Sequence, residues 1–411
     1  MESVSEKQHR LRQSVRKFRC RLKRRRLRQT TVLAITGSCG KTTTTRFLGK
    51  IISDHADCFV GIHDNDANSV MRSVRDTQRR HRFLVQEVSG GCPGAMDQVL
   101  PLLKPHVGIV TTIGQDHYRS FRTLDATAKE KGTLIEFLPE TGVAVLNADD
   151  PHVLAMSERA RARVITYGLC AEADVRATDV DAAWPQRLSM TVSYQGASVR
   201  IETALFGRVL SNSILAAVAG GLAAGVGLEQ CAESLKGIET FPRRMSIHRT
   251  TAGIWFINDA GKAPFWSVHG VVSQLSDAAA PRKTIVFGTF SDTPGSDSDK
   301  YRATAKWALE IADRVLFVGP KALAVRKWLA PDLEGRLFMI ESAREAARLL
   351  SEDVVNDELV LIKSGNRDHL ERLVYGQEVE LNCWKQSCPK MMSCEQCEES
   401  GLACCEGNDG S

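Results

Sequence analysis

The stretch Thr31-Val-Leu-Ala-Ile-Thr-Gly-Ser-Cys-Gly-Lys-Thr-Thr-Thr-Thr45 decides the fold. Its first five residues are apolar or β-branched, which is typical of a buried parallel strand. Apolar residues then recur at helical spacing, at Phe47, Leu48, Ile51 and Ile52. A glycine loop between a strand and a helix directs backbone N–H groups at a bound phosphate. The stretch therefore predicts a nucleotide-phosphate site made by Gly37, Ser38, Cys39, Gly40, Lys41, Thr42 and Thr43.

Within this loop, Lys41 is expected to neutralise phosphate charge and Thr42 to place its hydroxyl on Mg²⁺. The full phosphate-loop motif is not met, because Ile35 stands where its first glycine belongs. An ordinary glycine-rich turn is the alternative interpretation.

The composition is that of an ordinary globular protein with an uneven distribution of charge. The 411 residues are 43% hydrophobic and 25% charged, which suits two or three domains. No run approaches a membrane helix, and the amino terminus lacks the apolar core of a secretory signal. Six of the twelve cysteines are scattered through the body of the chain, which favours a reducing, cytoplasmic location.

The amino-terminal arm, residues 1–28, is strongly basic. Residues 1–30 carry twelve Lys/Arg against two Glu, whereas the remainder has 42 basic and 47 acidic residues. Apolar residues fall near one face of a predicted helix, at Leu11, Val15, Phe18, Leu22 and Leu27. Such a helix could bind an acidic partner protein or an anionic membrane, and the absence of an aromatic and glycine RNA-binding signature disfavours nucleic acid. A frayed or disordered arm that aids solubility is the alternative.

Strands alternate with helical stretches from Thr31 to about Phe241, which predicts an α/β fold with a mostly parallel sheet. Strands over 82–87, 107–113 and 142–147 each end in polar residues, and residues 171–204 read as a β-rich insertion. In parallel sheets the carboxyl ends of strands meet at one edge, where ligands bind. The polar residues that follow these strands are thus expected to share one site.

A second, smaller α/β unit of Rossmann-like pattern follows a boundary near Phe241. It has predicted strands over 254–258, 284–288, 314–319 and 358–363 and helices over 301–311 and 369–374. It lacks a G-x-G-x-x-G after its first strand, so dinucleotide binding is not supported. The predicted domains are an arm (1–28), a central ATP-binding domain (29–241), a carboxyl-terminal domain (242–375) and a cysteine-rich tail (376–411).

The ordered motifs over roughly residues 31–375 resemble the Mur ligase family, most closely the members that attach D-alanyl-D-alanine. The loop resembles T-G-T-N-G-K-T-T, with Ser38 and Cys39 replacing Thr and Asn. The resemblance implies that ATP and Mg²⁺ bind at Lys41, Thr42 and Glu87, with a second Mg²⁺ at His117. It also implies that Lys131 is the lysine carbamylated in the family, with Lys129 its neighbouring competitor.

Further along the chain the resemblance is looser. Asn147, in Asn-Ala-Asp-Asp, would lie near the nucleotide, and Asn212 is one place from the family's adenine-contacting asparagine. Arg244 fits the linker arginine that reaches the ATP phosphates, and Asp259 the acid that binds ribose. Lys363-Ser-Gly replaces the family's K-G-S, which alters the expected site of the incoming amine.

The resemblance implies an ADP-forming carboxylate–amine ligase that acts through an acyl phosphate and joins an amino acid or peptide amine to a small-molecule or peptide carboxylate. The phosphate loop begins at residue 37, which leaves no room for the family's amino-terminal UDP-sugar-binding domain. A specialised peptide or amide product is therefore expected. The alternatives are a poly-γ-glutamate or cyanophycin-like synthetase and a catalytically weak scaffold subunit.

The tail concentrates six cysteines in the last 29 residues. One C-x-x-C pair with cysteines nearby can bind Zn²⁺ through four thiolates, and the candidate ligands are Cys383, Cys388, Cys394 and Cys397. An iron–sulfur cluster, redox pairing and an unstructured tail are the alternatives.

Overall fold

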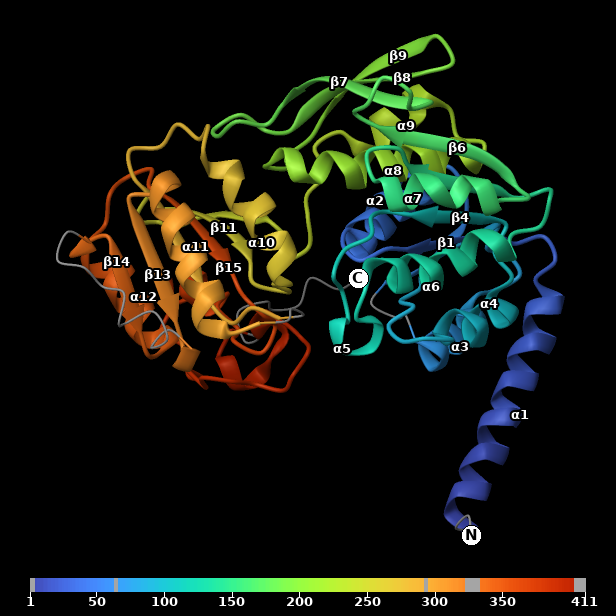
Figure 1. The fold of residues 1–411 in the computed structure, drawn as a ribbon, viewed down its shortest axis with the longest axis horizontal. Helices are drawn as coiled ribbons and strands as arrows, with labels where there is room; N and C mark the ends of the chain where they lie inside the picture. Colours follow the sequence, from blue (N-terminus) through green and yellow to red (C-terminus); the bar gives the residue numbers. More distant parts are fainter. Residues whose placement is uncertain (1–3, 63–65, 292–294, 322–332, 403–411) are drawn as a thin grey trace, which may run out of the picture. The chain divides into compact units, whose positions relative to one another are not determined.

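The computed structural model describes residues 4–62, 66–291, 295–321 and 333–402 (Figure 1). The chain forms two compact units. The first comprises Met1–Val180, Ser189–Thr203 and Leu210–Ile238, and the second comprises Asp181–Leu188, Ala204–Val209 and Glu239–Ser411. Three short segments of the predicted central domain, 181–188, 204–209 and 239–241, therefore group with the second unit.

The first unit is built on a nine-stranded sheet with the order β2-β3-β1-β4-β5-β6-β7-β8-β9. Strands β2 to β7 pair in parallel, and β8 pairs antiparallel with β9. The expected α/β fold with a mostly parallel sheet is confirmed. The strands are β1 Thr31–Thr36, β2 Cys58–Gly61, β3 Phe83–Glu87, β4 Val107–Val110, β5 Val143–Asn147, β6 Arg163–Gly168, β7 Val175–Asp181, β8 Ser189–Tyr194 and β9 Ala197–Glu202.

Helices cover both faces of this sheet, as right-handed crossovers between parallel strands require. On one face α2 packs against α8 and α9, and on the other α4 packs against α3 and α6. Val32 and Ala34 of β1 belong to the core beneath α3, α4 and α6. The helices are α1 Val4–Arg26, α2 Lys41–Ser53, α3 Ala67–Asp76, α4 Ala95–Leu103, α5 Tyr118–Phe121, α6 Leu124–Phe137, α7 Pro151–Leu154, α8 Ser211–Ala223 and α9 Leu228–Leu235.

The strand register brings the predicted site to one edge of the sheet. Ile35 of β1 lies beside Glu87, the last residue of β3, and Thr36 lies beside Val110, the last residue of β4. The predicted strand over 107–113 was therefore too long, because the chain leaves the sheet after Val110. The residues that follow these strands and the amino terminus of α2 meet at this edge.

The basic arm is a helix that packs on the first unit. Helix α1 contacts α3 and α4, and Cys20, Arg24 and Leu27 are buried. The Arg24 side chain donates hydrogen bonds to three carbonyl oxygens, those of Leu27, Leu103 and Lys104, at 2.7–3.1 Å. The prediction that Leu27 shares the apolar face of the helix was wrong, because α1 ends at Arg26 and Leu27 turns into the core. Within the described part of the chain, no helix is both long and apolar enough to span a bilayer.

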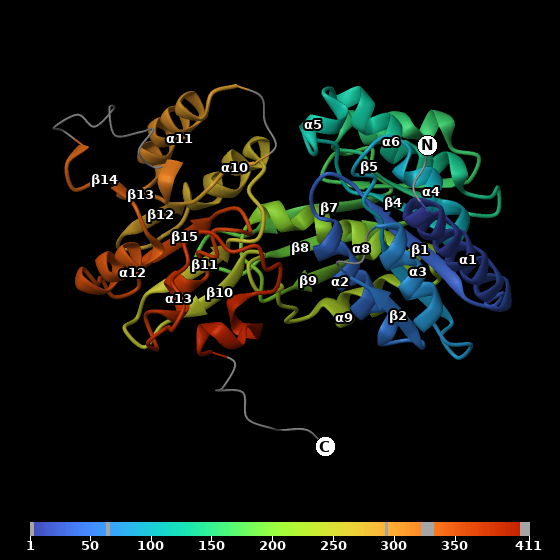
Figure 2. The ribbon, with the colours of Figure 1, turned by 90° about the horizontal axis from the view of Figure 1, so that it is seen from below.

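The second unit contains a six-stranded sheet with the order β10-β11-β15-β12-β13-β14 (Figure 2). Only β10 and β11 pair antiparallel. The strands are β10 Ser246–Arg249, β11 Trp255–Asp259, β12 Lys283–Phe287, β13 Arg314–Val318, β14 Leu337–Ile340 and β15 Leu359–Lys363. The helices are α10 Phe265–Val272, α11 Asp297–Ile311, α12 Ala343–Glu352 and α13 Arg372–Tyr375.

The prediction of a helix over 369–374 was wrong in its first half. His369 has φ +49°, in the left-handed region, so the chain enters α13 only at Arg372. The segment between β15 and α13 is therefore a loop, and His369 projects from it rather than from a helix face.

We predict that Arg24→Ala loosens the packing of α1. Its loss leaves the carbonyl oxygens of Leu103 and Lys104 without their charged donor, at a cost of about 2 kcal/mol. Trypsin should then cleave the arm several-fold faster, measured as the rate at which the intact chain is lost. Arg25→Ala, which changes an exposed arginine next to it, is the matched control. Equal cleavage rates in both variants would contradict the role of Arg24.

Candidate active site

The glycine loop is shaped by its contact with the end of β4. Gly37 has φ +144°, and a Cβ placed on it would lie 1.9 Å from Thr111 Oγ1. The Thr111 hydroxyl donates to the carbonyl oxygens of Thr36 and Cys39. On the other side, the Ser38 hydroxyl donates to the Gly114 carbonyl at 3.2 Å and accepts from the Gly114 N–H at 3.0 Å. Only glycine fits at position 37, since any side chain would displace Thr111.

Lys41 and Thr42 begin α2 where its unpaired N–H groups face the loop. Gly40 precedes the helix in the left-handed conformation, so the loop turns sharply into α2. Lys41 is buried and its Nζ donates to the Gly37 carbonyl at 2.5 Å, and Thr42 Oγ1 donates to Glu87 Oε2 at 3.0 Å. A hydroxyl and a buried carboxylate so close together are oxygen ligands of the type that Mg²⁺ prefers.

Glu87 leads into a loop at residues 88–91 that both other metal-site candidates approach. Lys131 of α6 is fully buried and its Nζ donates to the Ser89 carbonyl at 3.0 Å. His117 has φ +52° and packs beside Gly91, where an added Cβ would lie 3.4 Å from its Nε2. Lys129, the competing lysine, is exposed. The fold thus brings Glu87, His117 and Lys131 to one loop and leaves Lys129 in solvent.

Asn147 and Asp150 hold the backbone of the same edge. Asn147 Nδ2 donates to the Thr111 carbonyl at 2.9 Å, and Asp150 Oδ2 accepts from the Thr112 hydroxyl and the Ile113 amide at 2.7 Å. The hydroxyl of Tyr167, in β6, donates to the Val110 carbonyl at 3.0 Å. Burial raises the pKa of Tyr167, and the charges of Asp150 and Asp149 raise that pKa further, so the phenol stays a donor.

The amino terminus of α8 lies beside the glycine loop. A Cβ on Gly40 would lie 3.2 Å from Ser213 Oγ. Among the described residues no hydrogen-bond partner reaches the buried Oδ1 of Asn212, one residue before Ser213. An unsatisfied buried amide oxygen is costly, and a ligand amine that donates to it would offset that cost. The structure therefore leaves Asn212 able to accept a hydrogen bond from a ligand.

Two predicted nucleotide residues belong to the second unit. Asp259 ends β11 next to Lys363, the last residue of β15, and Lys363 Nζ donates to Asp259 Oδ2 at 2.5 Å and to the Lys262 carbonyl at 2.8 Å. Arg244 lies against Gly261, where an added Cβ would be 2.8 Å from its Nη1. Glycine at position 261 leaves room for this guanidinium.

The four cysteines predicted to hold zinc are not gathered into one site. Of Cys383, Cys388, Cys394 and Cys397, the described structure places only Cys394 in a cluster of three or more ligand atoms within 4.8 Å of one another. The other members of that cluster are His369 and Glu371. Cys404 and Cys405 lie outside the described residues.

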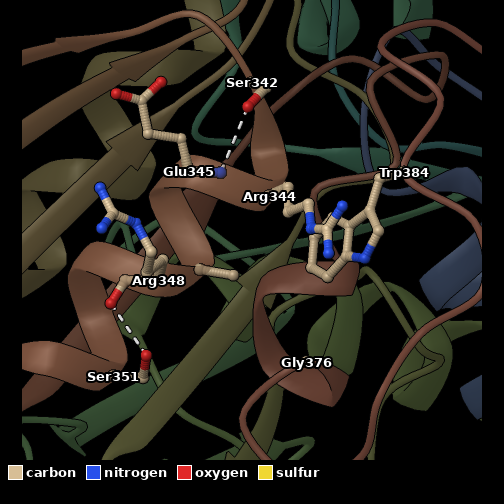
Figure 3. A pocket seen from close by; sticks show the side chains of 8 residues that line it. Ser342, Arg344, Glu345, Arg348, Ser351, Gly376 and Trp384 are labelled. Carbon is tan, nitrogen blue, oxygen red and sulfur yellow. Dashed lines mark hydrogen bonds between the residues drawn. The ribbon is translucent and has the colours of Figure 1, made fainter.

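A pocket of about 460 Å³ lies in the second unit, and none of its lining residues is a predicted site residue (Figure 3). Arg344 and Arg348 of α12 and Trp384 of the tail line it. Figure 3 shows the Arg344 side chain next to the Trp384 ring. Because Trp384 and residues of α12 line the same pocket, the tail packs on α12.

The sequence did not indicate several residues that hold the backbone or the side chains of the site in position. The predicted strand over 107–113 includes Thr111, whereas β4 ends at Val110. A polar residue directly after a buried strand, at the edge of the sheet where ligands bind, could have indicated that Thr111 belongs to the site. Glu130 accepts from the backbone N–H groups of Gly94 and Met96 at 2.8 Å, so it holds the start of α4. The pairing of Lys363 with Asp259 has no sequence signal, since the two residues are 104 positions apart.

Chemically, the edge of the first unit joins a phosphate-binding loop, an Mg²⁺-type oxygen pair and two candidates for a second metal. Positive charge from Lys41 and from metal ions would be placed where a phosphoryl group transfers. The residues present therefore fit a nucleoside triphosphate with magnesium.

The comparisons with known proteins agree with this geometry. Residues 35–220 match the family described as the Mur ligase middle domain. The UDP-N-acetylmuramoyl-tripeptide–D-alanyl-D-alanine ligase of Mycobacterium tuberculosis strain H37Rv is 28% identical over 236 residues, which are 57% of this chain. The match spans 46% of that relative's length, so the chain covers about half of it. The Bacillus subtilis ligase of the same name is 22% identical over 350 residues, covering 84% of this chain and 75% of the relative.

Two solved structures of similar fold are named MurF. The MurF ligase of Thermotoga maritima in complex with ADP superposes with a TM-score of 0.79 at 18% identity, covering 89% of this chain and 83% of that one. MurF from Acinetobacter baumannii gives a TM-score of 0.78 at 23% identity, covering 87% and 78%. At these identities the likeness establishes the fold.

We predict that Gly37→Ala both destabilises the first unit and weakens ATP binding. The new methyl group would meet Thr111 Oγ1 at a positive φ, and overpacking and strain together cost about 2 kcal/mol or more. Chemical denaturation and ATP titration measure the two effects. Gly196→Ala is the control, since Gly196 has φ +85° with nothing within 4 Å. An equal loss in both variants would show that backbone conformation, rather than the Thr111 contact, sets the cost.

Proposed function

We propose that this chain, whose residues 35–220 match the Mur ligase middle domain, is a ligase of the Mur ligase family that uses ATP to join a carboxylate to an amine and releases ADP and phosphate. The observation that supports this proposal best is the contact set around Glu87. Thr42 donates to its carboxylate, and the loop that follows it is contacted by buried Lys131 and by His117. A simple nucleotide-binding module has no need of the last two residues.

In the proposed reaction, ATP transfers its γ-phosphoryl group to the substrate carboxylate, and an amine then displaces phosphate to form the amide. Lys41 and the N–H groups of the glycine loop bind the phosphates and stabilise the charge that spreads over the transferring group. Thr42 and Glu87 would hold an Mg²⁺ that neutralises charge on the phosphate oxygens. His117 would hold a second Mg²⁺ near the substrate carboxylate.

Lys131 gains a specific role in this scheme. Its ammonium group is fully buried, and its Nζ donates to the Ser89 carbonyl in the loop that follows Glu87. Burying an ammonium ion is costly. Reaction of the neutral amine with CO₂, with loss of a proton, gives a carbamate whose oxygens are suited to the second Mg²⁺. We propose that Lys131 carries this carbamate in the active enzyme.

Arg244 and Asp259 complete the proposed nucleotide contacts. The guanidinium of Arg244 would supply a further cation to the phosphates, and the carboxylate of Asp259 would accept from the ribose hydroxyls. Lys363 holds Asp259 in place by their ion pair. Lys363, the first residue of the Lys363-Ser-Gly segment, therefore serves the acid of the nucleotide site in addition to any contact with the amine.

The substrates are proposed as classes. The relatives are named for adding D-alanyl-D-alanine, so dipeptides are the first amines to test, followed by single amino acids. A specialised peptide or amide is the proposed product. Repeated addition of one amino acid, as in a polymer synthetase, and a scaffold with weak catalysis are the alternatives.

We predict that the purified chain releases phosphate from ATP and Mg²⁺ when pools of dipeptides, amino acids and small acids are supplied. Lys131→Ala should lower the stimulated rate by about 100-fold or more, because a ligand of the reacting metal is lost. Lys129→Ala, which removes an exposed lysine from the same helix, should leave the rate unchanged. Lys41→Ala should abolish release by removing the phosphate-binding cation.

Each other outcome has a defined meaning. Equal rates in the two α6 variants would contradict the role of Lys131. ATP binding without stimulation by any pool would favour the scaffold. A product ladder in mass spectrometry would favour the polymer synthetase. A chain that binds no ATP would overturn the proposal.

A further inference from the structure

The cysteine-rich tail folds onto the loop that follows β15. Buried Arg372 donates through Nη1 to the Cys383 carbonyl at 3.2 Å and through Nη2 to the Lys385 carbonyl at 2.6 Å. Arg243 Nη2 donates to the Met391 carbonyl at 3.0 Å, and the Cys388 amide donates to the Arg367 carbonyl at 2.9 Å. These contacts carry Cys394 to a buried position beside that loop.

Three ligand-type atoms meet there from two separate segments. His369 Nδ1 lies 2.8 Å from Glu371 Oε1 and 3.5 Å from Cys394 Sγ. All three side chains are buried, with His369 at 2% exposure and Glu371 at 0%. Among the described residues no partner reaches Glu371 Oε2. The cluster therefore combines a nitrogen, a sulfur and a carboxylate that still has a free oxygen.

The hydrogen bonding of His369 shows that this cluster needs a cation. Its Nε2 lies 3.1 Å from the Lys390 carbonyl, which can only accept, so Nε2 carries a hydrogen. In a neutral imidazole Nδ1 then presents a lone pair to the Glu371 carboxylate. Two acceptor atoms 2.8 Å apart require a proton between them, or a metal ion that both bind with their separation widened to about 3.3 Å. A histidine that donates its other N–H to a carbonyl is the usual arrangement of a metal ligand.

We propose that His369, Glu371 and Cys394 form a zinc site that attaches the tail to the second unit. Sulfur, imidazole and carboxylate ligands suit Zn²⁺, and bond lengths near 2.0 and 2.3 Å put tetrahedral ligand atoms about 3.5 Å apart, as Nδ1 and Sγ are here. Glu371 Oε2 or a water completes the coordination. Arg243 Nη1, 3.7 Å from Glu371 Oε1, donates instead to Asn366 Oδ1 at 2.6 Å and lies outside the ligand set.

This site differs from the four-thiolate site that the cysteine spacing predicts. It uses one cysteine of the tail and two residues of the loop after β15, 25 and 23 positions earlier in the chain. Zinc would hold the tail by a bond between segments instead of closing the tail on itself. The site does not depend on the proposed ligase activity.

The test is the metal content of the full chain after equilibration with one equivalent of Zn²⁺ and gel filtration. We expect about one zinc per chain for the parent protein, and binding at least 100-fold weaker for His369→Gln and for Cys394→Ser. Cys388→Ser, at a half-buried tail cysteine outside the cluster, is the matched control and should retain zinc. Circular dichroism shows whether each variant is folded.

Cobalt substitution gives a readout that needs no variant. A single thiolate ligand predicts a sulfur-to-cobalt charge-transfer band about one quarter as intense as four thiolates would give. A four-fold stronger band, or loss of zinc in Cys388→Ser with retention in His369→Gln, would assign the metal to the cysteines and overturn the proposal. Absence of bound metal in the parent protein would also overturn it and would leave a protonated His369–Glu371 ion pair.

Helix α1 supports a second, independent inference. Its inner face carries Cys20 and Arg24, which pack on the first unit. At about 100° per residue, the opposite face carries an apolar row, made of Leu11, Val15, Phe18 and Leu22, all exposed. Leu11 is 67% and Phe18 61% exposed. Figure 1 shows the amino-terminal part of α1 extending beyond α3 and α4.

Basic side chains border the apolar row on both sides. By the helical repeat, one flank carries Arg12, Arg16, Arg19, Lys23 and Arg26, and the other carries Arg10, Lys17, Arg21 and Arg25. We propose that this face lies on an anionic lipid bilayer, with the row in the headgroup–acyl boundary and both flanks on lipid phosphates. Nucleic acid would bind the charges and leave Leu11 and Phe18 in water, which favours the bilayer.

Sedimentation with vesicles tests this surface. The full chain should bind vesicles that contain phosphatidylglycerol and not those of phosphatidylcholine alone, and salt should weaken binding. Leu11→Ser/Phe18→Ser should lower partitioning at least about tenfold, through lost apolar burial. Leu154→Ser/Phe137→Ser, a Leu and Phe pair of 39% exposure elsewhere on the first unit, should not. No binding to anionic vesicles, or equal binding by both double variants, would overturn the proposal.

Discussion

The contact between Gly37 and Thr111 is the constraint on which the active-site edge depends. The chain must turn out of β1 and wrap a polyphosphate while the end of β4 passes within contact distance, and only a residue without a side chain allows both. Thr111 then uses its hydroxyl to hold the loop, and Asn147 holds Thr111 from behind. Most of the polar residues at this edge therefore position backbone, and few remain for ligands.

Buried charge distinguishes the ligand-binding residues from these supports. Lys41, Glu87 and Lys131 are all nearly or completely removed from solvent, although ions are costly to bury. Thr42 and the carbonyl oxygens of Gly37 and Ser89 give them polar contacts. A protein that had no use for these charges would be more stable with apolar residues there. Their burial is thus a structural argument for function that the exposed Lys129 does not share.

In the second unit, charged side chains hold the tail and the ends of the strands in place. Arg372 and Arg243 hold carbonyl oxygens of a segment that has little regular secondary structure, and the ion pair of Lys363 with Asp259 joins the ends of two neighbouring strands. A loop with few apolar contacts needs such charged hydrogen bonds to stay in place. The left-handed conformation of His369 prevents α13 from including it. The imidazole of His369 contacts the Lys390 carbonyl of the tail.

The α/β class, the glycine loop and the acid that ends β3 could be predicted from the sequence, because each depends on a short-range pattern. These patterns are the alternation of strands with helices, the glycines between a strand and a helix, and a polar residue at the end of an apolar run. The contacts of Ser38 and Thr111, the burial of Lys131 against the exposure of Lys129 and the pairing of Lys363 with Asp259 are visible only in the tertiary structure. So is the grouping of Cys394 with His369 and Glu371 in place of its neighbouring cysteines. In each case the contacting residues are far apart in the sequence, or the two candidates differ only in burial. The local spacing of residues reports neither long-range contacts nor the exclusion of water.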